Sequence, residues 1–521
     1  MKKIICLYSL LMFVLFSNAQ AIEKKFNVFD QAKGSSAVET SDGQYIIVGQ
    51  DYDTGEGKKG ALYFKLDASG ELLWHNFIHQ EDGSSTVLTS VVETTDGSFI
   101  AMGSSIKYNT PDPGNVTSTI VIKFSGDGTV LWEKSFANPG EPLWNTAIGS
   151  HMTAYSDGGV VISINISSLA CGGAALIRIS ADGDLIWSKN YHGAGSGRDI
   201  LVTAADEIYF TGSINQGDGY KAHITKVNPS DGEQIISRIY DFSENATYGR
   251  GLESDGENIY LAGNHDGRLF LTKLSNDGEY TAIWSVFAGN EMDIPVDVEI
   301  VNERIVLAGV SYASGQKSIL SMVDFDGNLI DDYTFSNVGG AIGGMRISLG
   351  SENTLLMVGS FYESGSTNST IYFGKSGFPI PSHCSLFNED VSFDVATAIV
   401  TMPSFVESAS PIELPIAFER VELSQFEVNN YCSITEVVEH ENQPDFIQFY
   451  PNPASDQIQF ESTFVIKEHK IYDVSGKLIL REYSTTNDYQ KSIDVSGLNS
   501  GVYLIEVTTE NGVVNQQFIK R

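Results

Sequence analysis

The residues best suited to chemistry in this chain are scattered and form no recognised catalytic motif. Nine histidines include no His-Glu-x-x-His segment and no other pair at metal-binding spacing. The segment "GSGR" that begins at Gly195 is interpreted as a flexible loop, not a nucleophile elbow, and there is no phosphate loop. Aspartates and glutamates number 66, so an accidental pair at glycosidase spacing is expected by chance. The sequence therefore predicts no catalytic residue, metal site or cofactor, although an enzyme remains the second possibility.

Four basic residues precede the end of repeated segments by about 13 residues, on stretches expected to face a central channel: His151, Arg198, Arg250 and Arg346. The chain has a formal net charge of -34. Basic groups that gather in so acidic a protein could collect an anion such as a uronate or a lactate-like carboxylate. Channel residues satisfied by water are the alternative.

Aromatic residues form a second candidate group in connections that vary in length and composition. They are Tyr52, Tyr108, Trp144, Tyr312 and Tyr362, and they lie among Asp, Asn and Ser. Variable loops on a regular scaffold are where binding usually evolves. These residues could stack on sugars and hydrogen-bond to them, whereas solvated loops with incidental aromatic residues are the alternative.

Two repeated elements must position all of these residues. The first has seven copies, among them "ETSDGQYIIVG" at 39–49 and "ETTDGSFIAMG" at 93–103. The second includes "KLDASGELLW" at 65–74 and "KFSGDGTVLW" at 123–132, and its turn glycines are 46 to 58 residues apart. Asp caps its own turn and Gly accepts a positive φ, so both elements predict β-hairpins.

The acidic turns and their tryptophans are given a structural interpretation. A calcium loop needs ligands at three or more alternating positions and a distal carboxylate, which "DFDGN" at 324–328 and its relatives do not supply. Tryptophans that follow the turns are expected to pack between neighbouring sheets, in preference to stacking on a cofactor. They are Trp74, Trp132, Trp187 and Trp284.

Units of about four short strands at this period are typical of β-propeller blades. The last unit lacks an outer strand after 371–377, while "KFNVF" at 25–29 has no partner. Pairing these two segments would close the ring and cover two open strand edges. We therefore expect an all-β chain with a seven-bladed β-propeller over 22–377, with six or eight blades as alternatives.

The repeats resemble those of a group of secreted bacterial propellers. The second element also resembles the tryptophan-docking repeat of pyrroloquinoline-quinone dehydrogenases, which typically have eight blades and a vicinal cysteine pair at the cofactor. No adjacent cysteines occur in this chain. The resemblance therefore gives no support to quinone chemistry.

The N-terminus, "MKKIICLYSLLMFVLFSNAQA", has two lysines, an apolar stretch and small residues near its end. This pattern predicts a secretory signal peptide over 1–21, cleaved after Ala19 or Ala21. No later segment is apolar enough to span a membrane as a helix, so no integral membrane segment is expected after cleavage. The strong negative charge makes nucleic acid an unlikely class of partner.

The segment 378–445 is rich in proline and breaks the repeat pattern. It is interpreted as either a small β-rich module or an extended spacer, ending in an exposed acidic linker at 436–445. In an exported chain, Cys384 and Cys432 are a plausible disulfide, which leaves Cys171 as a buried thiol.

The last segment, 446–521, alternates apolar and polar residues and predicts a small C-terminal β-sandwich. It resembles the type A C-terminal sorting domain of the type IX secretion system of Bacteroidota. The residues that carry the resemblance are Tyr450, Pro451, Asn452, Pro453, Gly476, Gly501, Tyr503 and Lys520.

The resemblance implies passage through the periplasm, recognition by the outer-membrane translocon, and release or anchoring at the cell surface. Gly501 and Tyr503 would then serve folding and recognition. An accessory sandwich is the alternative. We expect a secreted or cell-surface propeller that binds extracellular polysaccharide or protein; the second possibility is a carbohydrate-active hydrolase or lyase that uses the loop face.

Overall fold

The computed structural model describes most of the repeat region and of the C-terminal segment. The described residues are 22–27, 31–53, 58–79, 85–107, 116–137, 146–167, 173–192, 194–215, 219–242, 245–288, 293–311, 317–337, 340–363, 368–377, seven short strands between 386 and 430, 447–451, 453–473, 478–509 and 513–521. The chain folds as two compact units, Met1–Ser433 and Ile434–Arg521.

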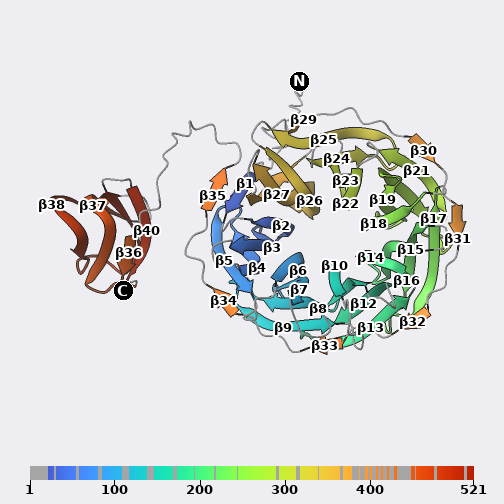
Figure 1. Cartoon of the computed structure of the whole chain (residues 1–521), viewed down its shortest axis with the longest axis horizontal. Coiled ribbons are helices and arrows are strands. Elements are labelled where there is room, and N and C mark those ends of the chain that lie inside the picture. Colours follow the sequence, from blue (N-terminus) through green and yellow to red (C-terminus); the bar gives the residue numbers. More distant parts are fainter. Residues whose placement is uncertain are drawn as a thin grey trace, which may run out of the picture. The chain divides into compact units, whose positions relative to one another are not determined.

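Strands of the first unit pair in chain order into four-stranded antiparallel sheets around a common centre (Figure 1). The first three sheets, blades 1 to 3, comprise β2 (Lys33–Glu39), β3 (Tyr45–Asp53), β4 (Lys58–Leu66) and β5 (Leu72–His79); β6 (Ser85–Glu93), β7 (Phe99–Lys107), β8 (Val116–Phe124) and β9 (Val130–Ala137); and β10 (Thr146–Ala154), β11 (Val160–Ser167), β12 (Gly173–Ile179) and β13 (Leu185–His192). The first strand of each sheet lies nearest the centre (Figure 1).

The remaining sheets repeat the same order, and within the described residues the pairings give seven sheets. Blades 4 to 7 comprise β14 (Ala194–Val202), β15 (Ile208–Asn215), β16 (Tyr220–Val227) and β17 (Gln234–Asp241); β18 (Thr247–Ser254), β19 (Asn258–His265), β20 (Arg268–Ser275) and β21 (Ala282–Ala288); β22 (Asp293–Val301), β23 (Arg304–Ser311), β24 (Lys317–Val323) and β25 (Leu329–Asn337); and β26 (Gly340–Gly350), β27 (Thr354–Glu363) and β28 (Ser369–Ser376) with β1 (Ile22–Asn27). The predicted all-β fold of repeated antiparallel sheets is confirmed.

The N-terminal strand β1 supplies the outer strand that blade 7 lacks. It pairs antiparallel with β28, with Phe26 opposite Ile371, and the Phe26 side chain is fully buried. The predicted closing strand began at Lys25, whereas the observed one begins at Ile22. On the inner side, the Glu39 carboxylate of blade 1 accepts hydrogen bonds from the backbone N–H of Ser351 (2.9 Å) and from the Lys375 ammonium (2.8 Å), both in blade 7. Blade 7 is thus tied to blade 1 at both its inner and its outer edge.

Seven short strands after the repeat region each pair antiparallel with the outer strand of a different blade (Figure 1). We call them the perimeter strands: β29 (Leu386–Phe387) on β25, β30 (Asp394–Ala396) on β21, β31 (Ile399–Thr401) on β17, β32 (Val406–Ser408) on β13, β33 (Ile412–Leu414) on β9, β34 (Glu419–Val421) on β5 and β35 (Glu427–Asn430) on β1.

The perimeter strands run round the ring in the reverse order of the blades, and each adds a fifth strand to its sheet. They therefore cover part of the outer edges that would otherwise offer unpaired backbone groups to another chain. This segment was expected to be either a module or a spacer; its described strands pair with the blades. Cys171, Cys384 and Cys432 lie outside the described residues.

The tryptophan that follows each second-element turn links its blade to the next one. The indole Nε1 of Trp132 donates to the carbonyl of Ala181 (3.1 Å), in the turn that ends at Gly183 of blade 3. Trp74, Trp187 and Trp284 make the same kind of hydrogen bond, at 3.0, 2.9 and 3.2 Å. The predicted packing of tryptophans between neighbouring sheets is observed.

The turn glycine is required by two features of this contact. Gly183 has a φ of 87°, a conformation that side chains disfavour. A Cβ added there would also lie 2.9 Å from Cδ2 of Trp132. The repeated glycine therefore allows the turn to form and the indole to lie against it.

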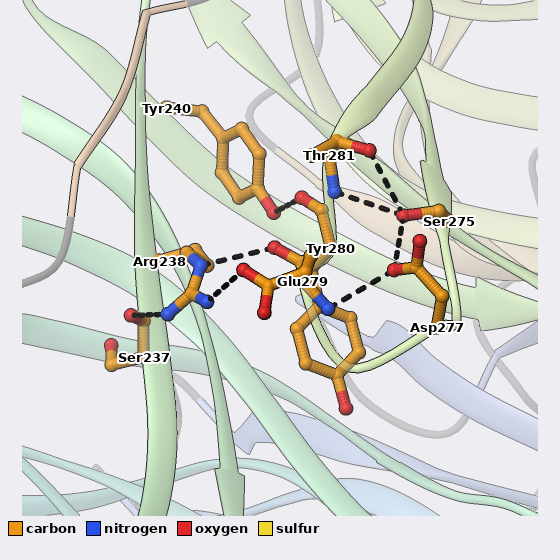
Figure 2. Close-up of polar contacts among 8 residues, drawn as sticks. All are labelled: Ser237, Arg238, Tyr240, Ser275, Asp277, Glu279, Tyr280 and Thr281. Carbon is orange, nitrogen blue, oxygen red and sulfur yellow. Dashed lines mark hydrogen bonds and ion pairs between the residues drawn. The ribbon is translucent and has the colours of Figure 1, made fainter.

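Blade 4 makes the same link with different residues (Figure 2). Ile236 stands opposite Lys226, where the other blades place tryptophan, and Arg238 reaches the next turn instead. The Arg238 guanidinium donates to the carbonyl of Glu279 (3.0 Å) and to its carboxylate (3.0 Å), and the Tyr240 hydroxyl donates to the carbonyl of Tyr280 (2.7 Å). Gly278 in this turn has a φ of 89°, but a Cβ added there would meet nothing within 4 Å.

The second unit contains one five-stranded antiparallel sheet. Its strands are β36 (Ile447–Tyr450), β37 (Gln457–Asp473), β38 (Leu478–Asp494), β39 (Gly501–Thr509) and β40 (Val513–Lys520). The pairing of β37 shifts register between Glu461 and Ile466, and residues from both halves of this strand, such as Phe460 and Ile471, share one buried cluster with Phe518. The sheet therefore folds over a single apolar core.

Replacing Gly183 by Ala should destabilise the protein more than the matched change Gly278→Ala. Both substitutions put a side chain at nearly the same positive φ, which costs about 1 to 2 kcal/mol. Only the first creates a clash with a tryptophan, which should add about 1 to 3 kcal/mol. Denaturant unfolding of both variants measures the difference, and equal losses would contradict the proposed role of the indole contact.

Candidate functional site

A β-bulge in the innermost strand of each blade determines which side chains face the axis. The register of every inner pairing shifts at the same place, for example between Gly149 and His151 and between Gly197 and Asp199. A bulge inserts one residue and redirects the side chain that follows. The residues that directly follow the shift, which we call the axial ring, are Ser36, Ser90, His151, Asp199, Gly251, Asp297 and Arg346.

The axial ring, apart from Gly251, lines a cavity of about 270 Å³. Two residues further along the inner strands, a second set of side chains lines the same cavity, including Glu253 and Glu299. Blades 1 and 2 contribute small neutral groups to the wall, among them Ser36 and Ser90. Blades 3 to 7 contribute the charged groups. The cavity therefore has a hydroxyl-lined side and a charged side.

His151 and Asp199 form an ion pair between blades 3 and 4. Asp199 is held in place by the backbone N–H groups of Ile200 (2.8 Å) and of Leu252 in the next blade (2.7 Å). Burial opposes the charge on His151, but the Asp199 carboxylate outweighs it and raises the pKa of the imidazole. Burial likewise opposes the charge on Asp199, and the pairing with His151 lowers the pKa of its carboxyl. The two groups therefore stabilise each other in their charged forms.

Asp297 makes the same connection from blade 6 to blade 7. Its carboxylate accepts hydrogen bonds from the backbone N–H groups of Val298 (3.1 Å) and Ile347 (3.2 Å). Burial raises the pKa of Asp297, while the positive charges of Arg346 and His151 oppose that rise. This carboxyl group thus lies between the two cations of the axial ring in their electrostatic influence.

Glu253 and Glu299 are hydrogen-bonded to each other across blades 5 and 6. Burial raises the pKa of Glu253 to about 7 and raises that of Glu299 well above its ordinary value. The hydrogen bond lowers the pKa of Glu253 and raises that of Glu299, so Glu299 holds the shared proton. Each also accepts one backbone N–H, Glu253 from Ser254 (2.8 Å) and Glu299 from Leu349 (3.0 Å).

Arg198 and Arg250 occupy the bulges themselves, one residue before the axial ring. Arg198 is exposed and Arg250 is half-buried, with Nε donating to Asn264 (3.2 Å). Neither has an ion-pair partner among the described carboxylates. Burial lowers the pKa of both guanidinium groups, that of Arg250 to about 10, and repulsion from Arg346 lowers it further. Three cations therefore lie within electrostatic reach of one another near the axis.

The structure separates the predicted site residues into two groups. His151 and Arg346 line the axial cavity, and Arg198 and Arg250 lie beside it. Tyr52 is half-buried in β3 beneath the Lys59 ammonium, 4.9 Å from the ring centroid, and does not line the cavity. Tyr108, Trp144 and Tyr312 lie outside the described residues.

Sequence reasoning missed the carboxyl groups of the cavity. Asp199 and Asp297 stand 13 and 12 residues before the glycines that end their first elements, at the position of His151 and Arg346. The same count therefore contained the signal, but the adjacent Arg198 was chosen. Glu253 and Glu299 follow two residues beyond the axial ring.

The C-terminal unit was compared with known families once its fold was clear. Residues 448–521 match the family described as "Secretion system C-terminal sorting domain". The protein is exported by the type IX route. It is a secreted or cell-surface protein. Among the described residues, no helix has the length and apolar character needed to cross a bilayer.

The sorting-domain residues lie on the strands of that unit. Gly501 and Tyr503 belong to β39, where the Tyr503 ring stacks on Phe518 with centroids 5.6 Å apart. Tyr450 is exposed and Lys520 is buried. Asn452 and Gly476 lie outside the described residues.

No curated protein matches the sequence of the chain. Solved structures share the fold at low identity. A protein of unknown function from Dyadobacter fermentans is 10% identical, covers 68% of this chain and 99% of its own, and gives a TM-score of 0.41. The polysaccharide lyase Uly1 is 8% identical over 67% of this chain and 90% of its own, with a TM-score of 0.41. A GH32 β-fructofuranosidase from Bombyx mori is 13% identical over 73% and 94%, with a TM-score of 0.27.

Replacing Glu299 by Gln should change how stability depends on pH. Because the native pKa values of Glu253 and Glu299 are raised above the ordinary value of 4.5, the wild type loses stability as the pH rises from there through about 7. Gln keeps a hydrogen-bond donor toward Glu253 but cannot ionise. The stability of the variant relative to the wild type should therefore rise between about pH 5 and about pH 8.

Denaturant unfolding at both pH values measures this trend. Glu257→Gln, which removes an exposed carboxylate outside the cavity, is the matched control and should show no such trend. A stability difference for Glu299→Gln that does not change with pH would contradict the shared proton.

Deleting residues 448–521 should block export without unfolding the first unit. The deleted segment belongs to the separate compact unit Ile434–Arg521, so the propeller keeps its own core. Fractionation of producing cells should place the truncated protein in the periplasm and the full chain outside. Truncated protein in the medium at the level of the full chain would contradict the role of the sorting domain.

Proposed function

We propose that this exported propeller binds an acidic extracellular polysaccharide at its axial cavity, with Arg198, Arg250 and Arg346 holding a carboxylate of the glycan. The observation that carries the proposal is the gathering of these three guanidinium groups near one axis. Carboxylates are the anions that guanidinium groups bind best, through paired hydrogen bonds.

The charge balance of the chain makes this gathering unusual. Lysine and arginine number 32 against 66 aspartates and glutamates, so carboxylates are abundant enough to neutralise every basic group. Arg198 and Arg250 nevertheless have no ion-pair partner among the described residues, and they repel each other and Arg346. A partly desolvated charge without a counterion costs free energy, which a bound anion would recover.

The opposite wall of the cavity suits the remainder of a sugar. Ser35, Ser36, Thr89 and Ser90 line it, and hydroxyl groups can both donate and accept hydrogen bonds. The volume of about 270 Å³ lies just below the range of about 300 to 1,000 Å³ that is usual for small-molecule sites. A site of this size favours a single sugar residue over a protein surface, so polysaccharide is preferred to a protein ligand.

The double variant Arg198→Ala/Arg250→Ala should lose affinity for polyuronates such as polygalacturonate and alginate by on the order of 100-fold, because each charged hydrogen bond contributes about 1.5 to 3 kcal/mol. Binding is measured on immobilised polyuronate, with a neutral glucan as the comparison surface.

The control is Lys59→Ala/Lys189→Ala, which removes the same charge from residues outside the cavity and should keep wild-type binding. Equal losses in both double variants would reduce the effect to net charge. A wild-type protein that binds no polyuronate would contradict the proposed function.

A further inference from the structure

We infer that the axial cavity also cleaves the acidic glycan that it binds, by β-elimination, with His151 as the base and Glu299 as the acid. This inference rests on the proposed binding function and adds a reaction to it. Such an elimination needs a neutralised carboxylate, a base for the carbon-bound proton beside it, and an acid for the departing oxygen. The cavity supplies all three from this chain's own residues.

The carboxylate would be neutralised by the arginines. A hydrogen on the carbon next to a carboxylate is a very weak acid, because its removal adds negative charge to a group that is already an anion. Cations fixed against that group stabilise the charge as it develops. Arg346, which lines the cavity, and Arg198 and Arg250 beside it are placed for this task.

His151 has the arrangement expected of a positioned base. Its Nδ1 faces Asp199, which leaves Nε2 as the nitrogen available to a substrate. The imidazole side chain is 33% exposed, whereas that of Asp199 is 7% exposed and is held by two backbone N–H groups. A buried carboxylate behind an accessible imidazole fixes the orientation of the ring and stabilises its protonated form. Asp199 is therefore a positioning residue and does not contact the substrate.

Glu299 is the proton donor because it shares its proton with Glu253 while both line the cavity. The same hydrogen bond argues against hydrolysis by this pair. Glycosidase carboxyl groups stand about 5 to 9.5 Å apart so that a sugar, with or without a water, fits between them. Two carboxyl groups in direct hydrogen-bond contact leave no such room. Elimination needs only one acid on the side of the leaving oxygen.

The atoms and electrons of the step balance within the site. Nε2 of His151 takes the proton from the carbon that bears the carboxylate. The electron pair of that C–H bond forms a carbon–carbon double bond to the neighbouring carbon as its bond to the glycosidic oxygen breaks. The departing oxygen takes the proton of Glu299. The imidazolium then returns its proton to solvent and the glutamate pair takes one up, so no oxidant or reductant is consumed.

The test incubates the full chain with polygalacturonate and with alginate, and follows the ultraviolet absorbance of the conjugated double bond. The wild type should form unsaturated products. His151→Gln and Glu299→Gln should each lose on the order of 100-fold in rate, because each removes one proton-transfer group. Both should keep binding, because the arginines are intact. Asp199→Asn should lower kcat with little change in KM and should move the alkaline rise of the rate toward lower pH.

The outcomes separate this inference from the proposed function. Polyuronate that is bound without any gain in absorbance overturns the elimination and leaves binding intact. Shortened products without a double bond show hydrolysis and also overturn it. Rates that survive in both the His151→Gln and the Glu299→Gln variants, with unfolding curves like that of the wild type, remove the assigned base and acid. Absence of both binding and turnover overturns the two proposals together.

Discussion

The contact between one blade and the next is the constraint on which the rest of the structure depends. A four-stranded sheet buries little on its own, so each blade must present one face to each neighbour. Near the outer strands, the indole of Trp132 lies against the turn of blade 3 and donates to its carbonyl. The turn can accept the indole only because Gly183 lacks a side chain. The hydrogen bond sets the height of one blade against the next while the ring excludes water from the gap.

The inner end of each blade obeys the same logic with polar groups. Ser36 accepts the backbone N–H of Val91 in the next blade, and Asp199 accepts that of Leu252. Inner strands converge on the axis, so bulky apolar side chains cannot be accommodated there from every blade. Short polar groups that reach a neighbouring backbone solve this problem and leave a space at the centre. The axial cavity is therefore a by-product of closure, and its charged side is what distinguishes this propeller from a purely structural one.

The sequence allowed the scaffold to be predicted better than the site. Acidic turns, recurring tryptophans and an unpaired N-terminal segment specify hairpins, blades and closure through local chemistry alone. The perimeter strands escaped prediction because strands of two to four residues, such as Leu386–Phe387, are too short to show alternation. They are strands only because the blades offer them an edge.

At the site, the basic residues were detectable because they are rare, whereas Asp199, Asp297, Glu253 and Glu299 are hidden among 66 acidic residues. The bulge adds a further difficulty, since one inserted residue changes which neighbour, Arg198 or Asp199, faces the axis. Only the register of the inner strands resolves that choice.

The perimeter strands also determine how a pull on the C-terminus would travel through the propeller. The last of them, β35, pairs with β1, the strand that completes blade 7. Tension applied through the linker therefore reaches the seam of the ring before any other blade, and it meets a ladder of only four residue pairs. Further detachment would have to proceed strand by strand around the circumference, each step breaking a separate short ladder. A load divided in this way can peel the belt gradually while the hydrogen bonds inside each blade stay intact.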